Sequence, residues 1–276
     1  MSAEAAPIIT CRGIGKRFPA GDHDVLALLD VDLEVRPAEF VVLLGPSGCG
    51  KSTLLYIMAG HLAPSSGDLR MHGEPISGPS PARGIVFQDF ALFPWLTVRE
   101  NIAFGLSLRW ARDKADGRDT RVDGLVRMVG LEGFETAKPH RLSGGMRQRV
   151  AIARTLATDP EVVLMDEPFG ALDAQTRDGM QRELMRIAAE TRKTIVFVTH
   201  SITEAALLAD RVVVLTARPG RVKEIVPIDL PRQRWNWRQE FSAQFLDVIG
   251  RLEELLGSEI QKSEAEELGH GVDSTT

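Results

Sequence analysis

The chain of 276 residues is predicted to be an α/β protein built around a largely parallel sheet. Two observations lead to this fold class. In the second half of the chain, short apolar runs alternate with stretches of helical spacing, which is typical of parallel strands joined by helices. In the first half, an apolar run at residues 39–44 leads through a glycine-rich turn, Gly45–Ser52, into a helical stretch at residues 51–60. This order predicts a buried strand with a ligand-binding turn at its end.

The N-terminal segment is expected to contribute strands of its own. Residues 8–12 and 28–35 have the composition of strands, and Pro19–Asp22 supplies a turn between them. Residues 1–7 carry no pattern and are expected to be loose. The further short strand candidates of the first half are residues 69–72 and 84–87.

The middle of the chain changes character and is predicted to be a helical lobe of about residues 89–157, inserted into the α/β core. Thr97 and Glu100 form a capping-box pattern, which predicts a helix over residues 98–108. A polar stretch follows it. The other helices expected here are residues 121–129 and a helix from Ser143–Gly145 to about residue 158.

After this lobe the α/β alternation returns. Turn residues at 217–220 separate the last two strands. Helical apolar spacing reappears at residues 238–256, and the polar residues 258–276 are expected to be flexible. The predicted strands are residues 161–166, 194–199, 211–216 and 222–227, and the predicted helices are 174–191 and 202–209. The domain therefore spans residues 8–230, with residues 231–276 as a C-terminal helical extension and flexible tail.

Composition narrows the class of protein. The net charge is −5 with both signs interspersed, and no basic stripe points to nucleic acid as a partner. The longest apolar runs, such as residues 40–44, are far shorter than the roughly 20 residues that span a bilayer. The N-terminus has no secretory pattern, so we expect a cytosolic protein that reaches a membrane only through a partner. The two cysteines, Cys11 and Cys49, are expected to be reduced thiols.

The glycine-rich turn fits the pattern G-x-x-x-x-G-K-[ST] completely. Its glycines let several backbone N–H groups converge on phosphate oxygens, and the following helix N-terminus adds partial positive charge. Lys51 is expected to reach the β- and γ-phosphates of a nucleotide, the Ser52 hydroxyl to ligate Mg²⁺, and Thr53 to reach the α-phosphate. The nucleotide-binding residues predicted here are Gly45, Pro46, Ser47, Gly48, Cys49, Gly50, Lys51, Ser52 and Thr53.

A second chemical signal is the pair of carboxylates at the end of an apolar strand, Asp166 and Glu167. Burying charged groups at the end of a strand costs free energy unless another charged group pairs with them. Successive side chains point to opposite faces of a strand. We therefore predict that Asp166 ligates Mg²⁺ and that Glu167 is the general base for an attacking water. The alternative is that both are solvated acids at an ordinary strand end.

These motifs, together with four others, closely resemble those of the ATP-binding cassette (ABC) ATPases. The resemblance covers roughly residues 8–228, and the motifs stand in the family's order. They are Gly45–Ser52, Gln88, Leu142–Met146 followed by Arg147-Gln-Arg149, Asp166-Glu167, Gly170–Asp173 and Thr199-His200. The resemblance implies a P-loop NTPase (RecA-like) parallel-sheet core, an N-terminal antiparallel β subdomain and an inserted helical subdomain.

The resemblance also implies a catalytic arrangement. Ser143, Gly144 and Gly145 would bind the γ-phosphate of ATP held by another copy, so two subunits sandwich two nucleotides head to tail. Gln88 is expected at Mg²⁺ or the attacking water, and His200 at the γ-phosphate. Two further residues complete the implied site: Asp173 at the dimer seam and Phe18 stacked on adenine, where a core phenylalanine is the alternative.

One cassette without a coiled-coil insertion favours a transport ATPase whose membrane subunit is a separate chain. Phe90–Trp95 is the expected docking segment for that permease; packing inside the helical lobe is the alternative. Phe93-Pro-Trp95, Gly144-Gly-Met146 and Ala217–Arg221 resemble the ATPases of nitrate, sulfonate and taurine importers. The resemblance thus implies an ATP- and Mg²⁺-dependent peripheral subunit on the cytoplasmic side of a bacterial inner membrane, served indirectly by a periplasmic solute-binding protein.

The sequence is also compatible with two other functions. A non-transport ABC ATPase acting on nucleic acid or ribosomes would show the same motifs. A small-molecule kinase could use the same phosphate loop, but it would have no use for Leu142–Met146. The C-terminal helix could pack on the core or extend the dimer contact, with Trp235 and Trp237 in front of it.

Overall fold

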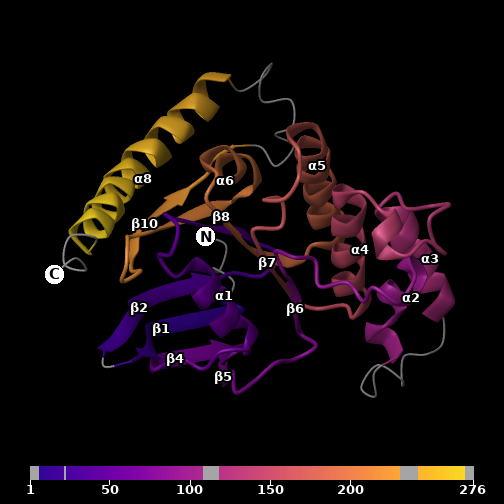
Figure 1. Ribbon diagram of the computed structural model, residues 1–276, viewed down its shortest axis with the longest axis horizontal. Coiled ribbons are helices and arrows are strands. Elements are labelled where there is room, and N and C mark those ends of the chain that lie inside the picture. The colour runs from indigo at the N-terminus through magenta and orange to yellow at the C-terminus, as the bar shows by residue number, and fades with distance from the viewer. Residues whose placement is uncertain (1–5, 22, 108–117, 231–241, 271–276) are drawn as a thin grey trace. The chain divides into compact units, whose positions relative to one another are not determined.

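The computed structural model describes residues 6–21, 23–107, 118–230 and 242–270. Its described residues divide into two compact units. The first combines the chain up to Gly78 with the chain from Val196 onward, and the second runs from Pro79 to Ile195. Figure 1 labels the elements that make up each of them.

The first unit begins with an antiparallel sheet whose strands follow the order β2-β1-β4-β5. The hairpin of its first two strands is longer than predicted, because pairing continues from residues 8–12 through register shifts to the turn at Gly21. Strands are predicted from the alternation of apolar and polar side chains. The register shifts interrupt this alternation, so the sequence did not predict the whole strand. The strands are β1 (Ile9–Ala20), β2 (His23–Val35), β4 (Ser66–Met71) and β5 (Glu74–Pro75).

The same unit contains the strands that carry the glycine-rich turn. Their order is β10-β9-β3-β8, with β3 parallel to β9 and β10 antiparallel to β9. All residues of β3 are buried, which explains its uninterrupted apolar sequence. The elements are β3 (Phe40–Leu44), α1 (Lys51–Ala59), β8 (Thr194–Thr199), α6 (Ile202–Leu208), β9 (Arg211–Leu215) and β10 (Val222–Pro227).

The C-terminal helix α8 (Ser242–His270) packs against α6 and β9 through an apolar face that includes Phe245 and Leu252. The sequence predicted that the helix ends at Leu256 and that a flexible tail begins at residue 258. This prediction is wrong, because the helix continues to His270. Residues 259–270 are mostly good helix formers, so the helix continues after its apolar stripe ends. Trp235 and Trp237 lie outside the described residues.

The second unit holds the helices of the middle of the chain and two parallel strands, β6 and β7. The capping box is confirmed: Thr97 Oγ1 accepts from the Glu100 N–H, and the Glu100 carboxylate accepts from the Thr97 N–H at 2.7 Å. The helix it opens is shorter than predicted. The elements are β6 (Arg83–Val86), α2 (Val98–Ala103), η1 (Gly105–Ser107), α3 (Arg118–Met128), η3 (Pro139–Arg141), α4 (Gly144–Ala157), β7 (Val162–Asp166) and α5 (Ala174–Thr191).

The predicted α/β fold with an antiparallel N-terminal sheet is confirmed. The second unit is broader than the predicted helical insertion of residues 89–157, since it includes β6, β7 and α5. The predicted domain boundaries at residues 8, 230 and 231 stay predictions. Among the described residues, no helix is long and apolar enough to cross a bilayer.

Candidate functional site

The phosphate loop between β3 and α1 has the backbone that its glycines predict. Gly48 has a φ of 74° and Gly50, the N-cap of α1, a φ of 99°, where other residues are strained. A Cβ on Gly50 would lie only 2.9 Å from the Ala27 carbonyl oxygen. Conformation and close packing against β2 therefore both require glycine at residue 50.

Lys51 lies inside this loop and is 5% exposed. Its Nζ donates to the Gly45 and Pro46 carbonyls at 2.8 and 2.7 Å. No side chain caps α1, and its first turn holds no acidic residue. An uncapped helix N-terminus beside an ammonium group binds anions, so this loop fits a nucleotide's phosphates. The other predicted loop residues lie at its exposed tip, Ser47 and Gly48, or on the first turn of α1, Ser52 and Thr53.

Both cysteines are free thiols, as predicted, and both are buried. Burial raises the pKa of Cys11 to about 12, and the Asp32 charge adds to the shift. Burial also raises the pKa of Cys49, although the nearby Lys51 opposes the shift. Cys49 therefore contributes a neutral thiol and its backbone to the phosphate loop.

His200 follows β8 in the first unit and is exposed. The turn that carries it is held by the buried pair Thr199 and Glu204, whose hydroxyl and carboxylate are 2.6 Å apart. Ser201 caps α6 by accepting from the Glu204 N–H. The role of His200 at the γ-phosphate stays a prediction, and Glu204 was not predicted, because a buried carboxylate on a short helix leaves no local signal in the sequence.

Phe18 lies on β1 of the same unit and is half-buried, with the Lys16 Nζ 5.2 Å from its ring centroid. A half-buried ring beside a cation is compatible with stacking on a base. The adenine contact stays a prediction.

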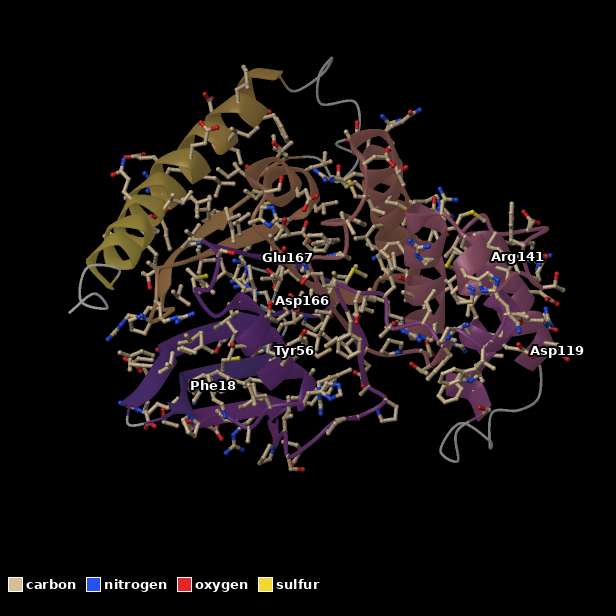
Figure 2. All side chains as sticks on the ribbon, in the orientation of Figure 1. Phe18, Tyr56, Asp119, Arg141, Asp166 and Glu167 are labelled. Atoms are coloured by element: carbon tan, nitrogen blue, oxygen red, sulfur yellow. The ribbon has the colours of Figure 1, made fainter. Side chains whose placement is uncertain are left out.

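The acidic strand end lies in the second unit. Every residue of β7 is buried, and Asp166, at its end, is 3% exposed. Figure 2 labels Asp166 and Glu167 at this end of the strand. Glu167 has a φ of 41°, an unfavourable conformation for a residue with a Cβ, and its carbonyl accepts from the Gly170 N–H at 3.1 Å. Strained backbone of this kind concentrates at functional positions, which supports a catalytic role for Glu167.

The signature segment begins α4 in the same unit. Ser143 is exposed and is the N-cap of α4, accepting from the Met146 N–H at 3.2 Å. A Cβ on Gly145 would meet the Thr176 methyl at 2.4 Å, and one on Gly144 would lie 3.3 Å from a Leu172 methyl. The two glycines therefore let the start of α4 pack closely on Leu172 and on the first turn of α5.

Asp173, predicted at a dimer seam, is the N-cap of α5. Its carboxylate accepts from the Thr176 N–H at 2.9 Å and from the Thr176 hydroxyl at 2.8 Å. These hydrogen bonds lower the pKa of Asp173. The side chain thus has a local structural role, and the predicted contact across a dimer stays a prediction.

Gln88 is exposed in the loop after β6, and the aromatic segment follows it. Phe90 and Ala91 have positive φ values of 63° and 44°. Arg154 of α4 holds both, donating to their carbonyls at 2.9 and 2.6 Å. Burial lowers the pKa of Arg154, against the effect of Asp89. The loop after Gln88 is thus tied to the helix that begins at the signature.

Within this segment the aromatic side chains are divided between interior and surface. Phe90 is buried, whereas Trp95 is 66% exposed. Phe93 contacts Trp95 and Phe104, with centroids 5.6 and 4.3 Å apart. The backbone of the segment is held by Asn101, which accepts from the Phe93 N–H and donates to three carbonyls of the loop. The described structure therefore presents an aromatic surface on a loop that side-chain hydrogen bonds hold in place.

A magnesium site would use few side chains. No group of three or more His, Cys, Asp or Glu side chains that could hold a metal lies in the described parts of the chain. Mg²⁺ bound together with nucleotide phosphates needs only one or two protein ligands, so a hydroxyl and a carboxylate are a fitting set. Ser52 lies in the first unit, and Asp166 and Gln88 lie in the second. Their joint action stays a prediction, as do the other roles that link the two units.

Comparison with curated proteins gives close relatives. The chain is 51% identical over 251 residues to the uncharacterized ABC transporter ATP-binding protein MJ0412 of Methanocaldococcus jannaschii, covering 90% of this chain and 91% of that protein. It is 52% identical over 216 residues to the taurine import ATP-binding protein TauB of Roseobacter denitrificans, covering 78% and 80%. It is 47% identical over 228 residues to the bicarbonate transport ATP-binding protein CmpC of Synechococcus elongatus, covering 82% of this chain and 34% of that protein.

Solved structures agree with the fold. The dimeric post-hydrolysis structure of the ATP-binding cassette MJ0796, bound to ADP and Pi, matches 81% of this chain and all of its own with a TM-score of 0.70 and 33% identity. The structure of cbiO1 from Clostridium perfringens, part of the ABC transporter complex cbiONQ, covers 90% of this chain and 99% of its own at a TM-score of 0.70 and 28% identity. The predicted cassette fold is confirmed.

The family model described as ABC transporter matches residues 28–170, a range that holds the phosphate loop, the signature and the acidic strand end. The family predicted from these motifs is therefore confirmed, and the chain belongs to the ATP-binding proteins of ABC transporters.

Proposed function

We propose that this chain is the ATP-hydrolysing subunit of an importer, and that it powers solute uptake through a separate membrane permease. The observation that carries the proposal is the phosphate loop, where Lys51 is buried beside an uncapped helix N-terminus. The relatives' names, which include taurine and bicarbonate transport, support import.

The direct test is phosphate release by the purified full chain with ATP and Mg²⁺. We expect free phosphate, released with a rate per subunit that rises with protein concentration because the active unit is a dimer. A phosphorylated small molecule in place of free phosphate would support a kinase instead. Stimulation by DNA or RNA alone would support the nucleic-acid alternative, which none of the named relatives supports.

In the proposed mechanism, residues of one copy bind ATP and residues of another complete the site. Lys51 and the loop N–H groups hold the β- and γ-phosphates, and Glu167 accepts the proton of the attacking water. His200 contacts the γ-phosphate and orients this water. When bound by Ser52, Asp166 and Gln88, Mg²⁺ would neutralise charge on the phosphates.

The second copy contributes Ser143, Gly144 and Gly145 to the γ-phosphate. Ser143 is exposed at the N-terminus of α4, where N–H groups and the helix dipole favour an anion. The MJ0796 cassette, which is dimeric with bound ADP and Pi, supports a dimeric working unit. ATP binding would close the dimer, and hydrolysis would reopen it.

We place the subunit at the cytoplasmic face of the membrane, with a solute of the nitrate, sulfonate and taurine group. The similarity to TauB, which is named for taurine import, supports this group. A periplasmic binding protein and the permease would select the solute, so this chain would not contact it. Growth of a deletion strain on defined nitrogen or sulfur sources would identify the solute.

The permease is proposed to dock on the aromatic surface formed by Phe93, Trp95 and Phe104. Trp95 is 66% exposed, and a large exposed ring of this kind is typical of protein interfaces. Arg154 of α4 holds the loop that follows Gln88, so a role of Gln88 at the nucleotide would be linked physically to the docking surface.

We expect Trp95→Ala to weaken permease binding by about tenfold or more, since an interface tryptophan commonly contributes 2 kcal/mol or more. Basal ATPase activity of the isolated subunit should stay unchanged, because the side chain is on the surface. Leu246→Ala is the control, as Leu246 is also exposed, at 59%, but lies on α8 in the other compact unit. Equal permease affinity of Trp95→Ala and the wild type, measured by co-purification or titration, would refute the docking assignment.

A further inference from the structure

A turn that carries none of the predicted nucleotide-binding residues contacts the phosphate loop. This turn, Thr216–Arg221, connects β9 and β10. The Arg218 guanidinium donates to the Gly48 carbonyl from Nε at 3.3 Å and from Nη2 at 3.2 Å. A Cβ on Gly220 would lie 2.0 Å from the Cys49 carbonyl oxygen, so turn and loop are in direct contact. The turn therefore limits how the loop backbone can move.

The turn is fixed internally and to β2. Thr216 Oγ1 donates to the Pro219 carbonyl and accepts from the Arg221 N–H, each at 3.0 Å. The Gly220 N–H donates to the Ala27 carbonyl at 2.9 Å. The Ala217 N–H, by contrast, donates to a side chain 42 residues further along the chain: the Glu259 carboxylate, at 3.0 Å.

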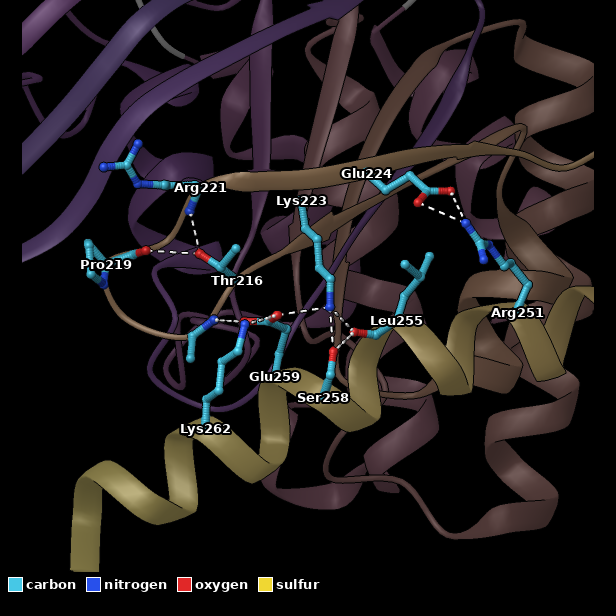
Figure 3. Close-up of polar contacts among 11 residues, drawn as sticks. Thr216, Pro219, Arg221, Lys223, Glu224, Arg251, Leu255, Ser258, Glu259 and Lys262 are labelled. Carbon is cyan, nitrogen blue, oxygen red and sulfur yellow. Dashed lines mark hydrogen bonds and ion pairs between the residues drawn. The ribbon is translucent and has the colours of Figure 1, made fainter. Parts of the chain in front are cut away.

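Glu259 lies on the buried face of α8, one turn after the apolar residues Leu255 and Leu256, and is 1% exposed. Lys223 and Lys262 form ion pairs with it at 2.8 and 2.9 Å (Figure 3). Burial raises the pKa of Glu259, but hydrogen bonds from the two lysines and the Ala217 N–H outweigh it and lower the pKa to about 2. The group is a charged acceptor at neutral pH, and such acceptors make strong hydrogen bonds.

We propose that Glu259 and Arg218 are positioning residues for nucleotide binding, through which the C-terminal helix holds the phosphate loop in its binding conformation. Glu259 holds the turn at Ala217, and Arg218 of that turn holds the Gly48 carbonyl. Loop N–H groups bind phosphates best when their direction is set before the nucleotide arrives. The inference rests on the proposed function, because it assumes that this loop binds a nucleotide.

If Glu259 served only to anchor α8, loss of another ion pair that anchors this helix would have the same effect on nucleotide binding. A second ion pair provides the comparison: Arg251 of α8 contacts Glu224 of β10 at 3.0 Å and does not touch the turn (Figure 3). Loss of this pair would loosen α8 but would leave Ala217 and Arg218 in place. The two roles can therefore be separated by variants.

The test measures ADP affinity of the full chain by calorimetry, together with KM and kcat for ATP. We expect Glu259→Leu, which places an apolar side chain on the buried face of α8 and removes the acceptor, to weaken ADP binding about fivefold to tenfold. Arg218→Ala, a change at an exposed side chain, should do the same. Both should raise KM and leave kcat within about twofold, because neither residue contacts the reacting atoms.

Two controls complete the design. Glu259→Gln keeps an oxygen that can accept from Ala217 and should restore most of the affinity, whereas Arg251→Gln should bind ADP like the wild type. The double variant Glu259→Leu with Arg218→Ala should be weakened less than the product of the single effects, because both act through one turn. Unchanged affinity in Arg218→Ala, or equal losses in Arg251→Gln and Glu259→Leu, would overturn the inference. Failure of the wild type to bind ADP would instead overturn the proposed function, and this inference with it.

Discussion

Replacement of Glu167 by glutamine is expected to reduce ATP turnover by about 100-fold or more while leaving ATP bound. A glutamine amide has nearly the shape of the carboxylate but cannot accept the proton of the attacking water, and general-base catalysis typically contributes about 10²–10⁴-fold. Binding should persist, because the phosphate loop lies on a different segment of the chain. The variant should therefore accumulate as an ATP-bound dimer.

Phosphate release and size-exclusion chromatography with ATP test this expectation together. Glu161→Gln is the matched control, since Glu161 directly precedes β7, at the end of the strand opposite Glu167, and is exposed. It should hydrolyse ATP at the wild-type rate. Wild-type turnover in Glu167→Gln would show that another group is the base. Asp166→Asn should instead need more Mg²⁺ for half-maximal activity, because an amide binds the cation less tightly than a carboxylate.

The second large effect is expected at the signature. Ser143→Arg should abolish turnover and ATP-dependent dimers but retain the ADP affinity of the monomer. The arginine would project from the exposed N-cap of α4 into the space that the partner's ATP is proposed to occupy. The phosphate loop is unaltered in this variant, so binding to one copy should survive the loss of the composite site.

Ser143→Ala separates this effect from the loss of the helix cap. Removal of a serine N-cap costs about 1 kcal/mol of stability, which lowers the melting temperature but does not fill the site. We expect the alanine variant to form ATP-dependent dimers in the Glu167→Gln background and the arginine variant to fail. If Ser143→Arg dimerised and turned over ATP normally, the head-to-tail arrangement would be wrong.

Local chemistry made the phosphate loop, the signature and the acidic strand end predictable. Each of them is a short contiguous segment in which the local backbone conformation or chemistry requires a particular residue type at each position. The positive φ angles of Gly48 and Gly50 and the capping serine at Ser143 are properties of such segments. The strong burial of β3 and β7 appears in the sequence as uninterrupted apolar runs. Bulges hid most of β1, because they shift the alternation by which strands are found.

The sequence by itself thus determined the cassette fold, the family and the residues expected at the nucleotide. Only the tertiary structure decided what supports them. Arg154 holds the loop after Gln88, and Glu204 holds the turn that carries His200. Glu259 reaches a turn 42 residues earlier in the chain, from a helix predicted to have ended before it. The hydrogen bonds of Arg154 and Glu259 join residues that lie far apart in the sequence. No hydrophobic periodicity or local motif identifies such partners, so only the folded structure reveals them.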